Sequence, residues 1–373
     1  MAERVPPGTV VAGLPLLRRT VLAAARAGFR DIRVHKALGG AEDLLVGTRA
    51  ATLTADEPDA PRAARRIVIL PANVVPQPRW LRSLLEAELH SETIYVDPSL
   101  ATVIETTDPA RVLAGAARYR SAGEVLGELR RAMAHLDGPF ELAGRFVLTL
   151  RGDARSAEAW LLRGLVKQRE GFMSRRFERR VSLALTRRLV GTRVTPDAMT
   201  LVSLAVGLVG AAFFLSSSPG YQLVGALLFL AHSILDGCDG ELARLKFMES
   251  RRGAILDFWG DNLVHVAVFG CIAVGSRLAT GALWPLALGA VTIASGLGAA
   301  ACVFRRTMLD VAPAAGASMT DRLTEAFSHR DFIYLVIVLS AFGRADVFLI
   351  LASVGTPIFL LLLLWVGAAR RRA

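Results

Sequence analysis

Lysine and cysteine are both scarce in this 373-residue sequence. Only three of its 44 basic residues are lysine, so arginine carries nearly all of the positive charge behind the net charge of +11. Three cysteines, Cys238, Cys271 and Cys302, are too few for a disulfide framework, and we expect them to be free and buried among apolar residues. The chain has no Gly-X-Y period and is 53% hydrophobic, which excludes a collagen-like or a disordered protein.

Hydrophobic residues are concentrated in the second half of the chain. Residues 1–170 mix acidic and basic residues as a soluble domain does, and we expect no signal peptide, because the first ten residues lack a cationic start followed by an apolar run. From Ala198 onward, long apolar runs alternate with short basic clusters. A membrane-spanning helix needs about 20 apolar residues. Six runs are candidates, of which the fifth is short: 198–215, 221–235, 254–274, 282–303, 332–342 and 347–366.

Basic residues occupy alternate loops between these runs. Clusters lie before the first run, between the second and third, between the fourth and fifth, and after the sixth. The opposite loops hold at most one arginine each. This asymmetry predicts six spans with both termini in the cytoplasm. The alternative, a soluble all-helical core, is disfavoured by the same asymmetry.

A basic amphipathic segment, residues 175–196, precedes the first run. Its apolar residues Phe177, Val181, Leu185 and Leu189 recur every four positions, with arginines between them. This pattern is typical of a helix that lies at a membrane surface. The alternative is a solvated helix packed on the soluble domain.

Four aspartates stand at the facing ends of the second and third runs. Asp236 and Asp239 are three positions apart, and Asp257 and Asp261 are four apart, so each pair lies on one helical face. The short connection predicts that the two helices are antiparallel neighbours, with the four carboxylates converging near the cytoplasmic surface. Four like charges at close range require divalent cations, and oxygen ligands favour Mg²⁺, Mn²⁺ or Ca²⁺. The sequence therefore predicts a two-metal site for phosphoryl-type chemistry.

The spacing of these residues is specific. From Asp236 to Asp261 the chain reads D-x2-D-G-x2-A-R-x8-G-x3-D-x3-D and matches the signature of the CDP-alcohol phosphotransferase family, which residues 175–373 resemble. Members of that family transfer the phospho-alcohol half of a CDP-linked donor to an acceptor hydroxyl and release CMP. The resemblance implies that Mg²⁺ or Mn²⁺ is held by Asp236, Asp239, Asp257 and Asp261, and that Asp261 is also the general base. It further implies that Gly240, Ala243, Arg244 and Gly253 line the CDP site.

A second family element opens the first apolar run. Thr195-Pro196-Asp197-Ala198-Met199-Thr200 resembles the family's T-P-N-x-x-T, with Asp197 in place of the usual asparagine. The resemblance implies that Thr200 faces the cytidine pocket.

Other polar residues lie near the predicted site. Arg305 and Arg306 follow the fourth run, where family members that use phosphorylated acceptors carry basic residues, and arginine binds phosphate bidentately. The positive-inside rule alone is an equally good explanation for these two arginines. His232 and His265 each lie four positions from an aspartate. Each either points into the site or hydrogen-bonds within the helix bundle, and we favour the second interpretation.

Residues 1–165 alternate strand and helix patterns. Strand-like runs lie at 32–35, 67–70 and 146–150, and helical patterns at 16–27, 78–89, 109–119 and 122–135, which predicts a layered α/β domain. Residues 12–20 and 27–34 resemble the start of sugar-nucleotidyltransferase domains. The junction at 165–179 resembles the bifunctional inositol-phosphate cytidylyltransferases and di-inositol-phosphate phosphate synthases, in which such a domain is fused to a phosphotransferase. Leu14 replaces that fold's usual lysine and Asn73 its metal-binding aspartate, so we expect a degenerate domain without cytidylyl transfer.

The sequence thus predicts three regions: a nucleotidyltransferase-like α/β domain at 1–165, a linker and interfacial helix at 166–196, and an all-α six-helix transmembrane domain at 197–373. The expected activity uses CDP-diacylglycerol or CDP-inositol as donor and an alcohol or phosphorylated alcohol as acceptor, in phospholipid or inositol-phosphate synthesis at the inner membrane. We expect membrane lipids as partners and no nucleic acid, and the resemblance implies a homodimer. The alternatives are a membrane transport or binding protein that uses the same carboxylates, and a non-catalytic scaffold.

Overall fold

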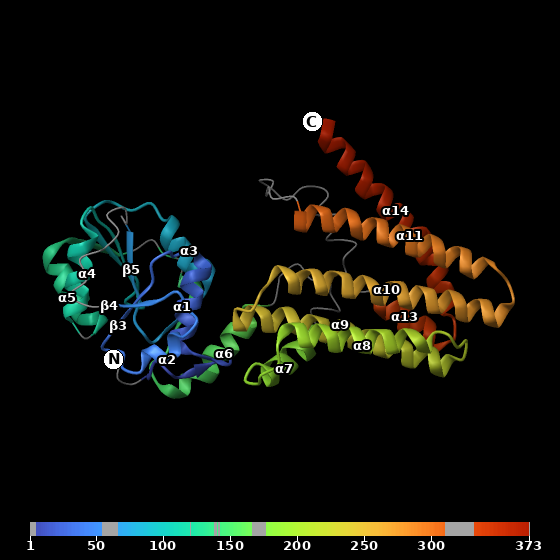
Figure 1. Cartoon of the computed structure of the whole chain (residues 1–373), viewed down its shortest axis with the longest axis horizontal. Coiled ribbons are helices and arrows are strands. Elements are labelled where there is room, and N and C mark those ends of the chain that lie inside the picture. The colour runs from blue at the N-terminus through green and yellow to red at the C-terminus, as the bar shows by residue number, and fades with distance from the viewer. Residues whose placement is uncertain are drawn as a thin grey trace. The chain divides into compact units, whose positions relative to one another are not determined.

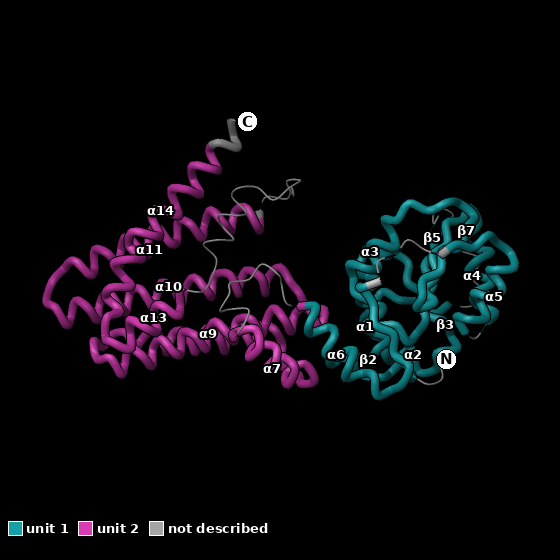
Figure 2. The backbone as a smooth tube through the Cα atoms, turned by 180° about the vertical axis from the view of Figure 1, so that it is seen from behind, with its two compact units in different colours: residues 1–164 teal, residues 165–373 magenta. Residues whose placement is uncertain are grey.

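The computed structural model of the chain describes residues 5–53, 66–119, 121–137, 140, 142–165, 177–309 and 332–372. The chain divides into two compact units, Met1–Gly164 and Leu165–Ala373 (Figure 2). The first unit mixes strands and helices, and the described part of the second is helical. All three cysteines are free, as predicted, but only Cys238 is buried, whereas Cys271 and Cys302 are half-buried.

A four-stranded sheet lies at the centre of the first unit. Its order is β5 (Arg66–Ile69), β8 (Thr102–Glu105), β7 (Thr93–Val96) and β9 (Ala134–Asp137). Strand β8 is antiparallel to both of its neighbours, whereas β7 and β9 are parallel. All four residues of β7 are buried, so its sequence lacks the polar alternation of a half-exposed strand. The sequence patterns consequently predicted β5 but neither β7 nor β8.

Helices α4 (Pro109–Arg118) and α5 (Ala122–Ala132) share one hydrophobic core with this sheet. Val112 of α4 and Leu129 of α5 pack in that core with Ile94 and Ile104 of the sheet. The predicted helix at 122–135 was too long at its end. Its last residues instead form β9, which pairs with β7 at the edge of the sheet.

The described residues of this unit also form three two-stranded pairs and four further helices. The pairs are β1 (Val10–Val11) with β2 (Leu14–Pro15), β3 (Arg33–His35) with β4 (Ala51–Leu53), and β6 (Val74–Pro76) with β10 (Arg145–Val147). The helices are α1 (Leu16–Ala27), α2 (Ala41–Leu45), α3 (Pro78–Glu86) and α6 (Ala154–Arg163). The strands predicted at 32–35 and 146–150 and the helices predicted at 16–27, 78–89 and 109–119 are therefore present, with ends shifted by a few residues.

A buried ion pair connects β10 with the end of β7. Nη2 of Arg145 lies 2.7 Å from Oδ2 of Asp97, and the two side chains are 6% and 0% exposed. The Arg145 guanidinium also lies 5.3 Å from the centre of the Trp80 ring. Asp97 accepts a further hydrogen bond from the backbone N–H of Ser99 at 2.7 Å. Removing either partner would leave a charge in a place that water does not reach, so the pair holds these two segments together.

Six apolar helices build most of the second unit, at the positions of the six apolar runs. They are α8 (Pro196–Phe213), α9 (Pro219–Lys246), α10 (Arg251–Thr280), α11 (Trp284–Phe304), α13 (Phe332–Ala341) and α14 (Ala345–Arg372). Five of the described helices, all but α13, are long and apolar enough to cross a membrane. The described part of α13 has ten residues and is about 15 Å long, half the thickness of the hydrocarbon core. The unit is therefore an integral membrane domain with five candidate spans.

Helix α8 packs against both α9 and α10, which run in opposite directions (Figure 1). The antiparallel direction agrees with the sequence prediction, but α8 holds the two helices in place, because their own backbones make few contacts. A Cβ atom at Gly207 of α8 would lie 2.7 Å from a methyl carbon of Val264 in α10 and 3.0 Å from the ring of His232 in α9. The absence of a side chain at Gly207 thus lets α8 approach both helices closely.

Helix α7 (Arg179–Leu189) precedes α8 and packs against α9. Of the predicted apolar stripe, Phe177 is 49% and Val181 40% exposed, so these side chains point away from the bundle. Its buried side is polar and includes Ser182 and Thr186. Residues 166–176, the first part of the predicted linker, lie outside the described residues.

Candidate active site

Three of the four predicted carboxylates meet at one place in the membrane domain. Asp236 and Asp239 come from α9 and Asp257 from α10, and one oxygen of each lies within 4.8 Å of the others. Asp236 and Asp239 are 6% and 5% exposed. Carboxylates this close repel one another unless a cation or a shared proton lies among them. Their hard oxygen atoms suit Mg²⁺, Mn²⁺ or Ca²⁺, so this carboxylate cluster (Asp236, Asp239 and Asp257) fits a divalent cation.

Thr200 of α8 hydrogen-bonds directly to the carboxylate cluster. Its hydroxyl donates to Oδ2 of Asp239 at 2.5 Å, and Thr200 itself is 4% exposed. The start of α8 is set one turn earlier, where the Thr195 hydroxyl accepts from the N–H of Ala198 at 3.3 Å and proline occupies the first helical position. The family-like segment at 195–200 therefore caps α8 and brings Thr200 to Asp239.

Asp261, the fourth predicted carboxylate, lies beside His232. Its Oδ1 is 3.1 Å from Nε2 of His232, and Nδ1 of His232 is 2.9 Å from the carbonyl oxygen of Ser203 in α8. A carbonyl only accepts, so Nδ1 carries a proton and donates it. His232 is 2% exposed and stacks on Phe229, with 6.1 Å between ring centroids. Both interpretations of His232 hold, because the ring is bonded within the bundle and also faces Asp261.

The remaining histidine of the prediction has an aromatic environment. His265 contacts Phe229 edge-on, with 5.5 Å between ring centroids, and lies 5.9 Å from the ring of Phe332 in α13. These contacts place His265 in the packing between α9, α10 and α13.

The signature glycines lie beside polar side chains. A Cβ atom at Gly240 would lie 3.2 Å from Nη1 of Arg244, which therefore folds back over the preceding turn of α9. A Cβ atom at Gly253 would lie 3.1 Å from Oδ1 of Asp197, at the start of α8. Ala243, like Arg244 and Gly253, is half-buried. These residues therefore sit at the same ends of α8, α9 and α10 as the carboxylate cluster.

Arg305 and Arg306 begin a π-helical turn, η5 (Arg305–Leu309), at the end of α11. Arg305 is exposed and Arg306 is half-buried. Arg251 of α10 donates to the carbonyl of Met308 in this turn at 3.3 Å, less than two helical turns before Asp257. Residues 310–331, which follow this turn, lie outside the described residues.

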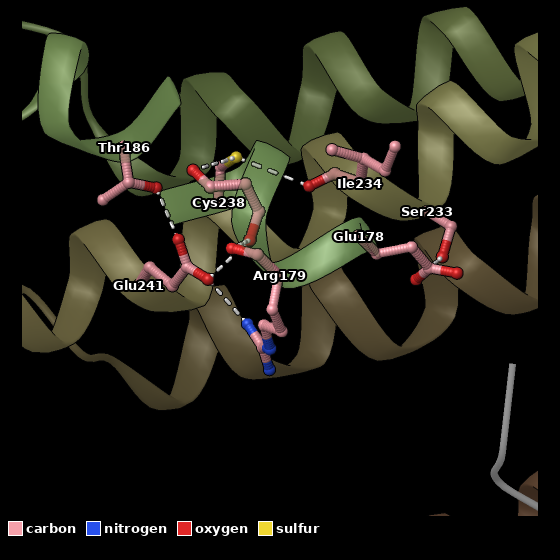
Figure 3. Close-up of polar contacts among 8 residues, drawn as sticks. Glu178, Arg179, Thr186, Ser233, Ile234, Cys238 and Glu241 are labelled. Carbon is pink, nitrogen blue, oxygen red and sulfur yellow. Dashed lines mark hydrogen bonds and ion pairs between the residues drawn. The ribbon is translucent and has the colours of Figure 1, made fainter. Parts of the chain in front are cut away.

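Sequence reasoning missed Glu241. This residue follows Asp239 by two positions, and its side chain is 0% exposed and paired with Arg179 of α7 (Figure 3). A signal was present in the chain, because Glu178, Ser182 and Thr186 recur every four positions beside the apolar stripe of the same segment. A polar stripe of this kind indicates a helix whose polar side faces a buried partner.

The membrane helices and the carboxylate cluster define an integral membrane protein with a buried group of carboxylates whose arrangement fits a divalent cation. Residues 193–369 match the model of the CDP-alcohol phosphatidyltransferase family. A protein of Rubrobacter xylanophilus described as a bifunctional IPC transferase and DIPP synthase is 30% identical, and the match covers 78% of this chain and 78% of that protein. The CDP-diacylglycerol–serine O-phosphatidyltransferase of Mycobacterium bovis is 39% identical over 75 residues, 20% of this chain and 25% of that protein.

Among solved structures, a phosphatidylinositol phosphate synthase of Mycobacterium tuberculosis with CDP-DAG bound covers 50% of this chain and 94% of its own. It is 20% identical, with a TM-score of 0.36, which is too low to support an argument about this fold. The match to the Rubrobacter protein over most of both chains and the match to the family model together establish the family of this chain. The chain belongs to the CDP-alcohol phosphatidyltransferase family and is a transferase that moves a phospho-alcohol group from a CDP-linked donor.

Proposed function

We propose that the carboxylate cluster, together with Asp261, is the catalytic centre at which the phospho-alcohol group passes to an acceptor hydroxyl and CMP is released. The observation that supports this most directly is the approach of Asp236, Asp239 and Asp257 to within 4.8 Å, at the positions of the family signature. Two divalent cations, Mg²⁺ or Mn²⁺, are the metals we assign to the four aspartates. When bound, they would neutralise the donor diphosphate and the departing CMP.

Asp261 is the general base in this proposal. It would accept the proton of the acceptor hydroxyl as that oxygen attacks the phosphorus atom, while the bond to CMP breaks. Its carboxylate lies 3.1 Å from Nε2 of His232, whose ring is itself held by the carbonyl of Ser203. Positioning donor and acceptor in line makes a covalent enzyme intermediate unnecessary.

The CDP end of the donor would lie along the signature residues near the ends of α8, α9 and α10. Gly240 and Gly253 leave room for it beside Ala243, and Arg244 supplies a guanidinium for the phosphates. Thr200 bonds to Asp239, and we assign it to orienting that carboxylate beside the cytidine pocket. Arg305 and Arg306 are the groups we assign to the phosphate of a phosphorylated acceptor.

Inositol-phosphate chemistry is the first substrate class to test. The relative described as a bifunctional IPC transferase and DIPP synthase aligns with more of this chain than the membrane unit contains, so the similarity extends into the first unit. We propose that the first unit is a degenerate nucleotidyltransferase-like domain, with Leu14 and Asn73 in place of its usual lysine and aspartate. CDP-diacylglycerol with a polar acceptor is the second class, as the name of the mycobacterial relative suggests.

The arrangement in the membrane completes the proposal. Five candidate spans and α13 would make six crossings of the inner membrane with both termini in the cytoplasm, which the alternating basic loops support. Helix α7 would lie in the interface, because Phe177 and Val181 are exposed beside arginines. A homodimer is part of the proposal by family resemblance.

CMP release by the purified full-length chain in detergent tests this function. CDP-inositol and CDP-diacylglycerol are offered as donors with a panel of polar acceptors, in Mg²⁺ or Mn²⁺. We expect metal-dependent CMP release that falls by at least about 100-fold in Asp261→Asn, since a general base contributes that much or more. Bound metal without CMP release from either donor, or full activity in Asp261→Asn, would contradict the proposal.

A further inference from the structure

Helix α7 is joined to α9 through buried polar contacts. Glu178, directly before α7, and Ser182 and Thr186 within it recur every four positions and therefore share one side, and they are 5%, 2% and 0% exposed. Glu178 accepts from the hydroxyl of Ser233 in α9 at 3.4 Å and from that of Tyr334 in α13 at 3.2 Å. Buried polar contacts of this kind tie α7 to its partners in one geometry, because each unmade bond would leave a desolvated polar group.

Glu241 is the centre of this contact. Its Oε1 accepts from Nη1 of Arg179 at 2.7 Å and from the hydroxyl of Ser182 at 2.8 Å, and its Oε2 accepts from the hydroxyl of Thr186 at 2.6 Å (Figure 3). All three donors belong to α7, and they use both oxygens of one carboxylate whose side chain is 0% exposed. The contact therefore fixes the orientation of the Glu241 carboxylate relative to α7, in addition to pairing its charge with Arg179.

The position of Glu241 on α9 connects this contact with the candidate active site. Successive helical residues are rotated by about 100°, so Glu241 lies about 200° from Asp239 and about 140° from Asp236 around the axis. One side of α9 therefore carries two members of the carboxylate cluster, and the opposite side carries the residue that α7 holds. A rotation of α9 that broke the contacts of Glu241 would also redirect Asp236 and Asp239.

We propose that Glu241 is a positioning residue for the metal site: held by Arg179, Ser182 and Thr186, it sets the rotation of α9 and thereby the direction of Asp236 and Asp239. This inference rests on the proposed function for its catalytic consequence. Its effect on metal binding can be measured without turnover. Groups that hydrogen-bond directly to metal ligands change metal affinity or activity by about 10- to 100-fold when mutated, and Glu241, which acts through the rotation of α9, should lie at the lower end of that range.

Mn²⁺ binding to the purified full-length chain, followed by the electron paramagnetic resonance signal of free Mn²⁺, is the decisive measurement. Glu241→Gln replaces an accepting oxygen with an amide, and Thr186→Val removes one donor at nearly constant size. The matched controls are Thr186→Ser, which keeps the hydroxyl, and Arg180→Gln, which changes the exposed arginine next to Arg179. Asp239→Asn shows whether the binding belongs to the carboxylate cluster.

We expect the Kd for Mn²⁺ to rise about tenfold in Glu241→Gln and by a smaller factor in Thr186→Val, and to stay unchanged in both controls. Unchanged Mn²⁺ affinity in folded Glu241→Gln and Thr186→Val, even with a lower Tm, would overturn the proposal, because a merely structural role predicts that result. Unchanged binding in Asp239→Asn would also overturn it. Mn²⁺ binding without CMP release would instead refute the proposed function, and the comparison of variants would still decide the role of Glu241.

Discussion

Replacing Thr200 with valine removes one hydroxyl from the carboxylate cluster and leaves a side chain of nearly the same size. In the wild type this hydroxyl donates to Oδ2 of Asp239 at 2.5 Å, and the two residues are 4% and 5% exposed. With valine, Asp239 loses a donor at a position where water has little access to replace it. A hydrogen bond to a charged group contributes about 1.5–3 kcal/mol.

The expected effect on catalysis follows from that energy. Since about 1.4 kcal/mol corresponds to a factor of ten, Thr200→Val should lower kcat/KM for CMP release by about 10- to 100-fold. Thr200→Ser keeps the hydroxyl and should retain activity within a few-fold of the wild type. Initial rates of CMP release in saturating Mn²⁺, together with the Kd for Mn²⁺, measure the effect for both variants.

The same experiment separates two roles of Thr200. If Thr200 orients Asp239, valine weakens Mn²⁺ binding and lowers kcat. If Thr200 contacts only the cytidine of the donor, valine raises KM for the donor and leaves the Kd for Mn²⁺ unchanged. The second result, or equal activity of the valine and serine variants, would refute the orienting role.

Three further predictions concern metal removal, a buried charge and pH. Chelation by EDTA should abolish CMP release and added Mg²⁺ or Mn²⁺ should restore it; activity that persists in EDTA would contradict a metal-dependent site. Arg145→Met leaves the 0% exposed side chain of Asp97 without its cation and should lower the free energy of unfolding by about 3–5 kcal/mol in a denaturant titration, whereas no change would contradict a buried pair. The backbone N–H of Leu150 and the hydroxyl and N–H of Thr149 donate to the Asp153 carboxylate and hold its pKa below the ordinary 3.8. The contribution of Asp153 to the stability of the fold is therefore complete above pH 3.8, and it is lost as the pH falls through the lowered pKa. The Tm difference between the wild type and Asp153→Asn should therefore narrow in acid, and a difference that does not depend on pH would contradict this.

The membrane helices could be predicted because a span needs a long apolar run whatever its neighbours are. Each of the six apolar runs corresponds to one helix in the structure. The convergence of Asp236, Asp239 and Asp257 could also be predicted, because helical spacing and a short connection place them at the facing ends of two antiparallel helices. The packing of α8 against both α9 and α10 could not, since it depends on Gly207, whose role appears only once Val264 and His232 surround it.

The first unit shows where local patterns fail. Strand β7 is buried in all four residues, so no period of two identifies it. The segment after Ala132 continues a helix-like composition, yet it forms β9 because β7 offers an open edge. In α7, the apolar stripe was visible, but which side of the helix would be buried depended on Glu241, 55 positions beyond Thr186.

Helix α8 contacts both the proposed metal ligands and the histidine beside the proposed general base. Thr200, Ser203 and Gly207 lie on one face of α8, at spacings of three and four residues. The hydroxyl of Thr200 holds Asp239 of the carboxylate cluster, and the carbonyl of Ser203 holds His232, which faces Asp261. A shift of α8 along or around its axis would therefore disturb the proposed metal ligands and the proposed general base together. This arrangement explains why one helix without a catalytic side chain of its own is packed so closely against both helices that carry them.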